Sequence, residues 1–198
     1  MNPKFKTCAL TKAGTLLLPA GRLSYPNLFK ARPMPGESDD KAKFGTSVIL
    51  PPDSDLTLAL KMVEEAAVDK WGKNIGKVKR PFIKHAEKTE DAELAAAFPI
   101  LVRMSSAKAP SVIYGNGEPC TVDDEVYPGR WARVSVRIYA WEHQTGGRGV
   151  SFGLSNVQLL DHDDRIGGGR AKVEDEFEFI ADANDSAAKS GNPDSIFK

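Results

Sequence analysis

Residues 130–142 read RWARVSVRIYAWE, and residues 149–160 read GVSFGLSNVQLL. Apolar and polar residues alternate along the first run, and apolar residues recur at close spacing in the second, which is typical of β-strands. The turn sequence Thr145-Gly146-Gly147 separates the two runs. We therefore expect them to form the two longest strands of a mostly β protein, joined at this turn.

The alternation divides the first run into two faces with different chemistry. One face is small and branched and suits the interior of a barrel: Ala132, Val134, Val136, Ile138 and Ala140. The other interleaves aromatic rings with guanidinium groups: Trp131, Arg133, Ser135, Arg137, Tyr139 and Trp141. Unpaired bases stack on aromatic rings for roughly 1–3 kcal/mol each and phosphates bind cations, so this face predicts a surface for single-stranded nucleic acid. Alternatively, the rings pack under a helix or in a dimer interface, and the arginines form surface ion pairs.

Shorter elements precede the two long strands. Residues 44–50 alternate and stop at Pro51-Pro52, which predicts another strand. Apolar residues at helical spacing, with Asp53 or Ser54 as the cap and Gly72 as the stop, predict a helix over about 53–71. Strand signals resume at 98–105 and 111–114, after a short helical turn at 92–97, and Gly115-Asn116-Gly117 marks a tight turn.

Charge is distributed unevenly along a chain whose net charge is zero. Residues 1–160 hold 22 Lys and Arg against 17 Asp and Glu, and residues 161–198 hold 5 against 10. The chain of 198 residues suits one domain with appendages. We expect a basic domain over 1–160 and a flexible, largely disordered acidic tail over 161–198, hinged at Gly167-Gly168-Gly169. Charge that merely fluctuates along solvated surfaces is the alternative.

A second basic cluster begins at the end of the predicted helix and continues through a polar stretch at 73–91. Its members are Lys70, Lys73, Lys77, Lys79, Arg80, Lys84 and Lys88, with Trp71 and Phe82 among them. A basic loop beside a barrel face attracts phosphate, although a merely solvated loop is the competing interpretation. Arg103 and Lys108, on or next to the predicted strand at 98–105, are further candidates for phosphate contacts.

These features together resemble the small helix-destabilising, single-stranded DNA-binding replication proteins of tailed phages. The resemblance rests on the basic strand that ends in Tyr139-Ala140-Trp141, the glycine-containing turn, the strand 149–160 and the Gly-rich, acidic end. Lys77, Lys79 and Arg80 followed by Pro81 match a basic stretch after the family's helix, and the order of elements agrees over roughly 1–180. The family's tail is strongly acidic and ends in an aromatic residue. The tail of this chain differs, because its acidic residues become sparse after Asp185 and it ends in Phe197-Lys198.

The resemblance implies an OB-fold, with a five-stranded barrel, one inserted helix at about 53–71 and a disordered C-terminal tail. OB barrels carry such a helix between their third and fourth strands, though an insertion elsewhere fits the pattern equally well. The resemblance also implies DNA binding through Arg133, Tyr139, Lys77, Lys79 and Arg80, and a tail that contacts replication partners such as the phage polymerase and helicase/primase. It implies a role in replication and recombination in the cytoplasm of the infected bacterial host. Oligomeric state is left open, a homodimer included.

Catalytic and cofactor signals are weak. Paired acids such as Asp123-Asp124 fit solvated loops, and the three histidines have neither metal-ligand nor triad spacing. Gly167-Gly168-Gly169-Arg170 lacks the lysine and hydroxyl of a phosphate-binding loop. We therefore predict a non-enzymatic protein without cofactor or metal and without a membrane segment. A metal-dependent nuclease and a structural phage assembly protein are the alternatives.

Overall fold

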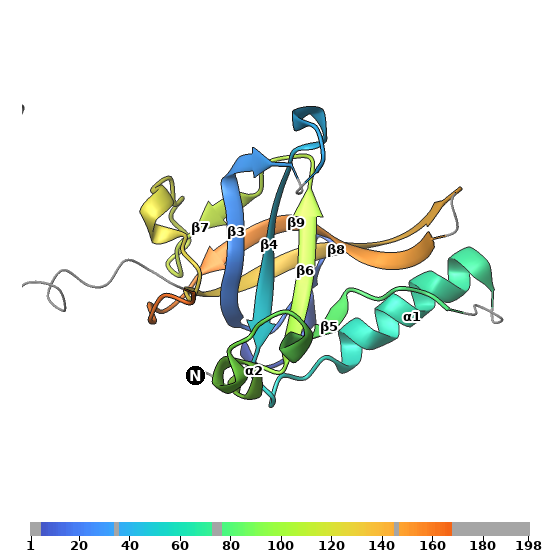
Figure 1. The fold of residues 1–198 in the computed structure, drawn as a ribbon, viewed down its shortest axis with the longest axis horizontal. Helices are drawn as coiled ribbons and strands as arrows, with labels where there is room; N and C mark the ends of the chain where they lie inside the picture. The colour runs from blue at the N-terminus through green and yellow to red at the C-terminus, as the bar shows by residue number, and fades with distance from the viewer. Residues whose placement is uncertain (1–4, 34–35, 73–76, 145–146, 168–198) are drawn as a thin grey trace, which may run out of the picture. The chain divides into compact units, whose positions relative to one another are not determined.

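The computed structural model describes residues 5–33, 36–72, 77–144 and 147–167 (Figure 1). The chain divides into two units, Met1–Gly167 and Gly168–Lys198, and the described residues all belong to the first. Most of the predicted acidic tail, with two of the three hinge glycines, and Lys73 therefore lie outside the described residues.

The described part is mostly β. Its strands are β1 (Ala9–Leu10), β2 (Leu16–Leu17), β3 (Gly21–Arg32), β4 (Lys43–Leu50), β5 (Phe82–Lys84), β6 (Ile100–Ser106), β7 (Ser111–Ile113), β8 (Trp131–His143) and β9 (Gly147–Leu159). Its helices are α1 (Thr57–Trp71), α2 (Ala92–Ala97) and the 3-10 turns η2 (Asp39–Lys41), η3 (His85–Glu87) and η4 (Asp123–Glu125). The predicted long strands and the helical turn at 92–97 are confirmed.

Five strands close into a ring. β3 pairs with β4, β4 with β6, β6 with β9, β9 with β8, and β8 returns to β3. Only the β6–β9 pair among these is parallel. In Figure 1, β3, β4 and β6 stand side by side while β8 and β9 cross behind them. The predicted OB-fold-like arrangement of five strands is confirmed.

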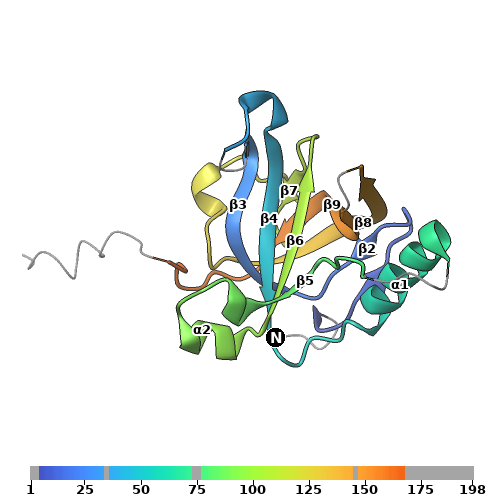
Figure 2. The ribbon, with the colours of Figure 1, turned by 45° about the vertical axis from the view of Figure 1, so that its right-hand side comes forward.

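The inserted helix occupies a different place in the strand order from the usual one. α1 follows β4 and precedes β6, so it lies between the second and third strands of the ring. Its start also differs from the predicted cap at Asp53 or Ser54, because the N-cap residue is Leu56, whose side chain makes no capping bond. The Asp55 carboxylate, one residue earlier, accepts the Thr57 N–H at 2.9 Å. Gly72 ends the helix as predicted, with a φ of 76°. The short second helix α2 lies at the lower end of β6 (Figure 2).

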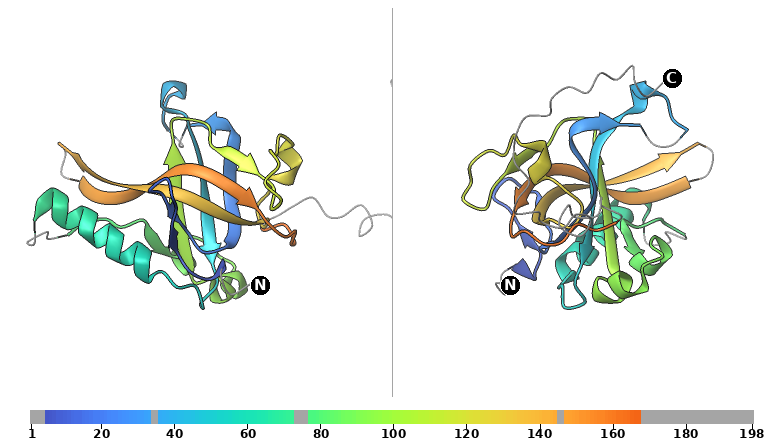
Figure 3. Two further views of the ribbon diagram at one scale, coloured as in Figure 1. Left: turned by 180° about the vertical axis from the view of Figure 1, so that it is seen from behind. Right: turned by 60° about the vertical axis from the view of Figure 1, so that its left-hand side comes forward.

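The core fills the ring with the small, branched face of β8. Ala132, Val134 and Val136 are each at most 1% exposed, as predicted, and Ile138 and Ala140 pack against the core while partly buried. Beyond the ring, the β8–β9 hairpin projects alongside α1 (Figure 3). The projecting hairpin therefore has one face that is turned to α1 and a second face that is turned away from it.

Candidate nucleic-acid interface

One face of the projecting hairpin is fixed to α1. The Trp71 Nε1–H donates to Glu142 Oε2 at 2.9 Å, and the Arg148 guanidinium lies 5.7 Å from the centre of the Trp71 ring. Ile138 and Ala140 lie on the same side of the hairpin as Glu142, because residues two positions apart on a strand point to the same face. The helix therefore covers this face, and a base that stacks on the hairpin must do so on the opposite one.

The opposite face combines large side chains on β8 with minimal ones on β9. The register pairs Arg137 with Gly153, Tyr139 with Ser151 and Trp141 with Gly149. Paired residues of antiparallel strands point to the same side, so three large side chains lie over a strip of glycine and serine. This strip was not predicted, although alternate small residues at 147, 149, 151 and 153 are its signal in the sequence.

The strip lets the aromatic rings lie against the backbone of β9. A Cβ at Gly149 would stand 2.8 Å from Trp141 Cζ2, and the Trp141 Nε1–H donates to Ser151 Oγ at 2.8 Å. A Cβ at Gly153 would stand 3.6 Å from Tyr139 Cε1. Tyr139 is 46% exposed and Trp141 is half-buried. Each ring is thus supported from below by the strand while part of its surface stays open to a base.

Lys79 joins this face from the segment that follows α1. Its N–H donates to the Arg148 carbonyl at 3.1 Å, and its carbonyl accepts the Val150 N–H at 2.9 Å, so the segment runs beside the start of β9. The Lys79 Cβ lies 3.0 Å from the place of a Cβ at Gly149. The exposed Lys79 side chain therefore starts on the same face as the Trp141 ring.

Two arginines complete the positive charge of this face. Ser105 on β6 pairs with Gly153, and Arg103, two residues earlier on β6, points to the same side. Arg103, Arg137 and Lys79 are all exposed, and none of them forms an ion pair within the part of the chain that the structure describes. We call Lys79, Arg103, Arg137, Tyr139 and Trp141 the hairpin face.

The side chain of Arg80, another predicted contact, is directed to α1 rather than to this face. Arg80 donates to Glu64 Oε2 on α1 at 2.6 Å, whereas its neighbour Lys79 faces β9. Lys77, Lys84 and Lys108 are exposed, and they stay predicted phosphate contacts. Lys84 lies on β5, and Lys108 follows β6.

Trp131 and Arg133 share the predicted face of β8, but other segments cover them. The Trp131 Nε1–H donates to Asp163 Oδ2 at 2.8 Å, and its ring centre lies 5.8 Å from that of Phe98. The Arg133 guanidinium lies 4.9 Å from the ring centre of Phe5, and burial lowers its pKa. The structure therefore brings together Arg137, Tyr139 and Trp141 and leaves Trp131 and Arg133 in packed positions.

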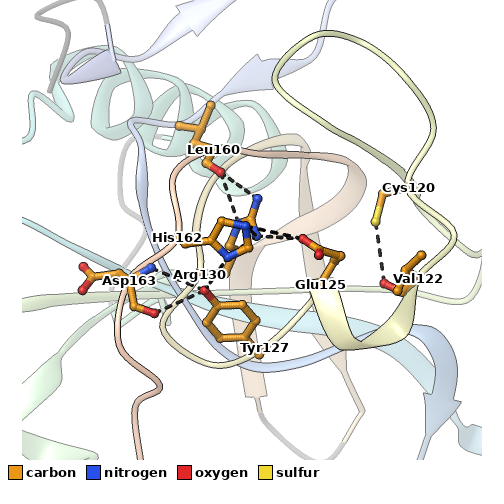
Figure 4. A network of polar contacts seen from close by, with 8 residues as sticks. All are labelled: Cys120, Val122, Glu125, Tyr127, Arg130, Leu160, His162 and Asp163. Carbon is orange, nitrogen blue, oxygen red and sulfur yellow. Dashed lines mark hydrogen bonds and ion pairs between the residues drawn. The ribbon is translucent and has the colours of Figure 1, made fainter.

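A buried polar network holds the chain where it leaves β9 (Figure 4). Arg130 is 4% exposed, donates to the Leu160 carbonyl through Nε and Nη2, and contacts Glu125 Oε2 at 2.9 Å and His162 Nδ1 at 2.7 Å. The Tyr127 hydroxyl lies 3.0 Å from the same His162 nitrogen. Residues 161–167, which the sequence analysis places in the tail, thus begin against the five-stranded ring.

Within the described residues, no group of three His, Cys, Asp or Glu side chains is placed to hold a metal ion. No helix in that part of the chain is long and apolar enough to cross a membrane.

Several solved structures share this fold. The single-stranded DNA-binding protein from bacteriophage Enc34 in complex with ssDNA is 21% identical, with a TM-score of 0.65 over 82% of this chain and 94% of that one. The gp2.5 single-stranded DNA-binding protein of bacteriophage T7 is 15% identical, with a TM-score of 0.56 over 84% of this chain and 98% of that one. At these identities the likeness establishes the fold. A search of curated proteins found no match.

A comparison with protein families identifies the family of the chain as well as its fold. The family described as "Enterobacter phage Enc34, ssDNA-binding protein" matches residues 15–188, which include the five-stranded ring, the hairpin face and most of the predicted tail. The family and the structural neighbours are DNA-binding proteins, in agreement with the prediction of a non-enzymatic protein. The resemblance inferred from the sequence is confirmed: the chain belongs to the Enc34-type family of phage single-stranded DNA-binding proteins.

Proposed function

We propose that this protein binds single-stranded DNA without sequence preference, through base stacking on Tyr139 and Trp141 and phosphate contacts from Lys79, Arg103 and Arg137. The observation that supports the proposal is the hairpin face itself. Its two aromatic rings rest on β9 and are partly exposed, and they lie among cations that have no ion-pair partner in the described residues. Every base has a π-face, so such a surface tolerates any sequence. Equilibrium titration with matched single-stranded and duplex oligonucleotides tests it, and equal or tighter duplex binding would refute it.

Lys79 and Arg80 form a matched pair for testing the phosphate contacts. Binding through phosphates gives a log–log salt slope of about −0.7 per phosphate on a single strand. Lys79→Ala should flatten the slope by roughly one contact, because its charge is on the hairpin face. Arg80→Ala should leave the slope unchanged, because Arg80 is paired with Glu64 on α1. Titrations between 50 and 300 mM salt measure both slopes, and a larger change in Arg80→Ala would reverse the assignment.

The biological setting of the proposal follows from the family. We propose that the protein acts in phage DNA replication and recombination in the cytoplasm of the infected host. The division into a DNA-binding domain over 1–160 and an acidic segment over 161–198 supports a docking role for the latter, with the phage polymerase and helicase/primase as its partners. The charge of that segment, with 10 acidic against 5 basic residues, is what supports this role.

The same acidic segment should compete with DNA. Its net charge of −5 opposes the +5 of residues 1–160, and a tethered competitor reaches an effective concentration in the millimolar range. Deleting residues 171–198 should therefore tighten DNA binding at low salt. The gain should shrink as the Debye length falls from about 30 Å at 0.01 M to about 10 Å at 0.1 M.

A variant with unchanged length separates charge from bulk in that experiment. Replacing Glu174, Asp175, Glu176 and Glu178 by their amides keeps the segment but removes four negative charges. It should reproduce most of the gain that the deletion gives. Equal affinities of the deletion, the amide variant and the parent for DNA across this salt range would refute the competition. Docking would then be the remaining proposed role of the segment.

A further inference from the structure

A second group of exposed aromatic rings lies on β3, where the strand departs from its register with β4. Ser24 pairs with Ser47 and Asn27 with Gly45, so Tyr25 and Pro26 together oppose one residue of β4. This bulge puts Tyr25 in the left-handed region, with a φ of 49°, as no other non-glycine residue of the described part does. A left-handed tyrosine costs backbone free energy, and strain of this kind gathers at ligand-binding sites.

The bulge borders a cavity of about 380 Å³ beside η4 (the yellow turn next to β3 in Figure 1). The cavity falls within the usual size range of small-molecule sites. Tyr25, Asn27, Phe29 and Arg32 line it from β3, and Asp123 and Val126 line it from η4 and the residue after it. Lys30 also borders it, and neither Lys30 nor Arg32 forms an ion pair among the residues described.

The exposure of the rings singles out this cavity. Among the described residues, the large aromatic side chains that are exposed are Tyr25 at 78%, Phe29 at 37% and Tyr139 at 46%. Tyr139 belongs to the hairpin face, and the other two border the cavity. Exposed rings next to unpaired cations suit a base and its phosphate, and an amide and a carboxylate can bond the polar edge of a base.

The sheet connects the cavity to the hairpin face. Gly153 of β9 pairs with Ser105 of β6, Ser105 with Gly45 of β4, and Gly45 with Asn27 of β3. These paired positions share the outer side of the ring, and those on β9, β6 and β4 are glycine or serine. At about 4.8 Å between neighbouring strands, the path from β9 to β3 follows the sheet for roughly 14 Å. At about 3.4 Å per stacked nucleotide, that path corresponds to roughly four nucleotides.

We propose that the β3 cavity is a second base-binding subsite, reached by a single strand of DNA that already occupies the hairpin face and crosses β6 and β4. The proposal rests on the function proposed above. The proposal makes the affinity for single-stranded DNA depend on the length of the strand. The end bases of four stacked nucleotides lie about 10 Å apart, at about 3.4 Å for each of three steps, which is short of the roughly 14 Å path. A strand of four nucleotides therefore occupies one aromatic group at a time, whereas a strand of twelve spans both.

Tyr25→Gly is the decisive variant, because it removes the ring at a backbone conformation that glycine adopts freely. Its melting temperature should equal or exceed that of the parent, while affinity for dT12 should fall about fivefold or more and affinity for dT4 should change less than twofold. Tyr25→Phe keeps the ring and should bind dT12 like the parent. The measurement is fluorescence anisotropy with full-length protein.

The outcomes separate the subsite from the proposed function. Tyr139→Ala, measured alongside, should weaken both oligonucleotides. If Tyr139→Ala weakens both while Tyr25→Gly binds dT12 like the parent, the hairpin face stands and the β3 subsite is refuted. If Tyr139→Ala changes neither, the proposed function itself fails. An equal loss for dT4 and dT12 in Tyr25→Gly would also overturn the two-subsite path.

Discussion

Replacing Tyr139 and Trp141 together by alanine is expected to weaken binding of single-stranded DNA by about 2–6 kcal/mol, which is at least about 30-fold. Each ring should stack one base, and each is supported by a small residue of β9 rather than by core side chains. The hydrophobic core inside the five-stranded ring contacts the other face of β8, so the variant should stay folded. Titration with dT12 measures the loss, and circular dichroism verifies the fold.

The control for this variant keeps the rings. Tyr139→Phe combined with Trp141→Phe removes the hydroxyl and the indole N–H that bonds Ser151, but it leaves two π-faces. It should retain most of the affinity, since stacking requires the ring. A folded alanine double variant that binds like the parent would move the DNA-binding site away from the hairpin face.

Replacing Arg130 by alanine should lower the free energy of unfolding by about 1.5–3 kcal/mol, the contribution expected of hydrogen bonds to charged groups. Arg130 is 4% exposed, and its removal leaves the Glu125 carboxylate, which is about one-third exposed, without its partner and the Leu160 carbonyl without two donors. For a domain of this size, each kcal/mol lowers the melting temperature by roughly 2–4 °C. Urea unfolding of the full-length protein measures the change.

Arg165 offers the matched control for Arg130. It belongs to the same region, with its guanidinium 4.6 Å from the ring centre of Tyr127, but its side chain is exposed. An exposed cation–π contact contributes about 0.5–1 kcal/mol, so Arg165→Ala should cost no more than that. Equal small losses in the two variants would show that the Arg130 network does not stabilise the fold.

The sequence predicted the hairpin well because its signal is local. A period of two along 130–142 determines which side chains share a face, and the structure confirms the interior positions Val134 and Val136. The pattern cannot tell which part of the other face is covered. Phe5 and Phe98, from distant parts of the chain, cover Arg133 and Trp131, and such contacts leave no trace in the periodicity of β8.

The basic loop shows the same limit. Lys79 and Arg80 are adjacent and carry the same charge, so composition groups them in one cluster. Their separation depends on a short pairing between Lys79 and Gly149, which directs Lys79 to the hairpin face and Arg80 to Glu64. The bulge at Tyr25 is likewise a matter of register between β3 and β4, which the sequence analysis did not address.

Photochemical cross-linking tests the central claim most directly. Full-length protein is irradiated with a dT12 oligonucleotide that carries 5-iododeoxyuridine, and mass spectrometry of the digested complex locates the attached side chains. Bases stacked on the hairpin face should cross-link to Tyr139 or Trp141, and unlabelled dT12 should suppress the products. Cross-links at Trp71 or Trp131, with none at Tyr139 or Trp141, would contradict the proposal that this face binds the bases.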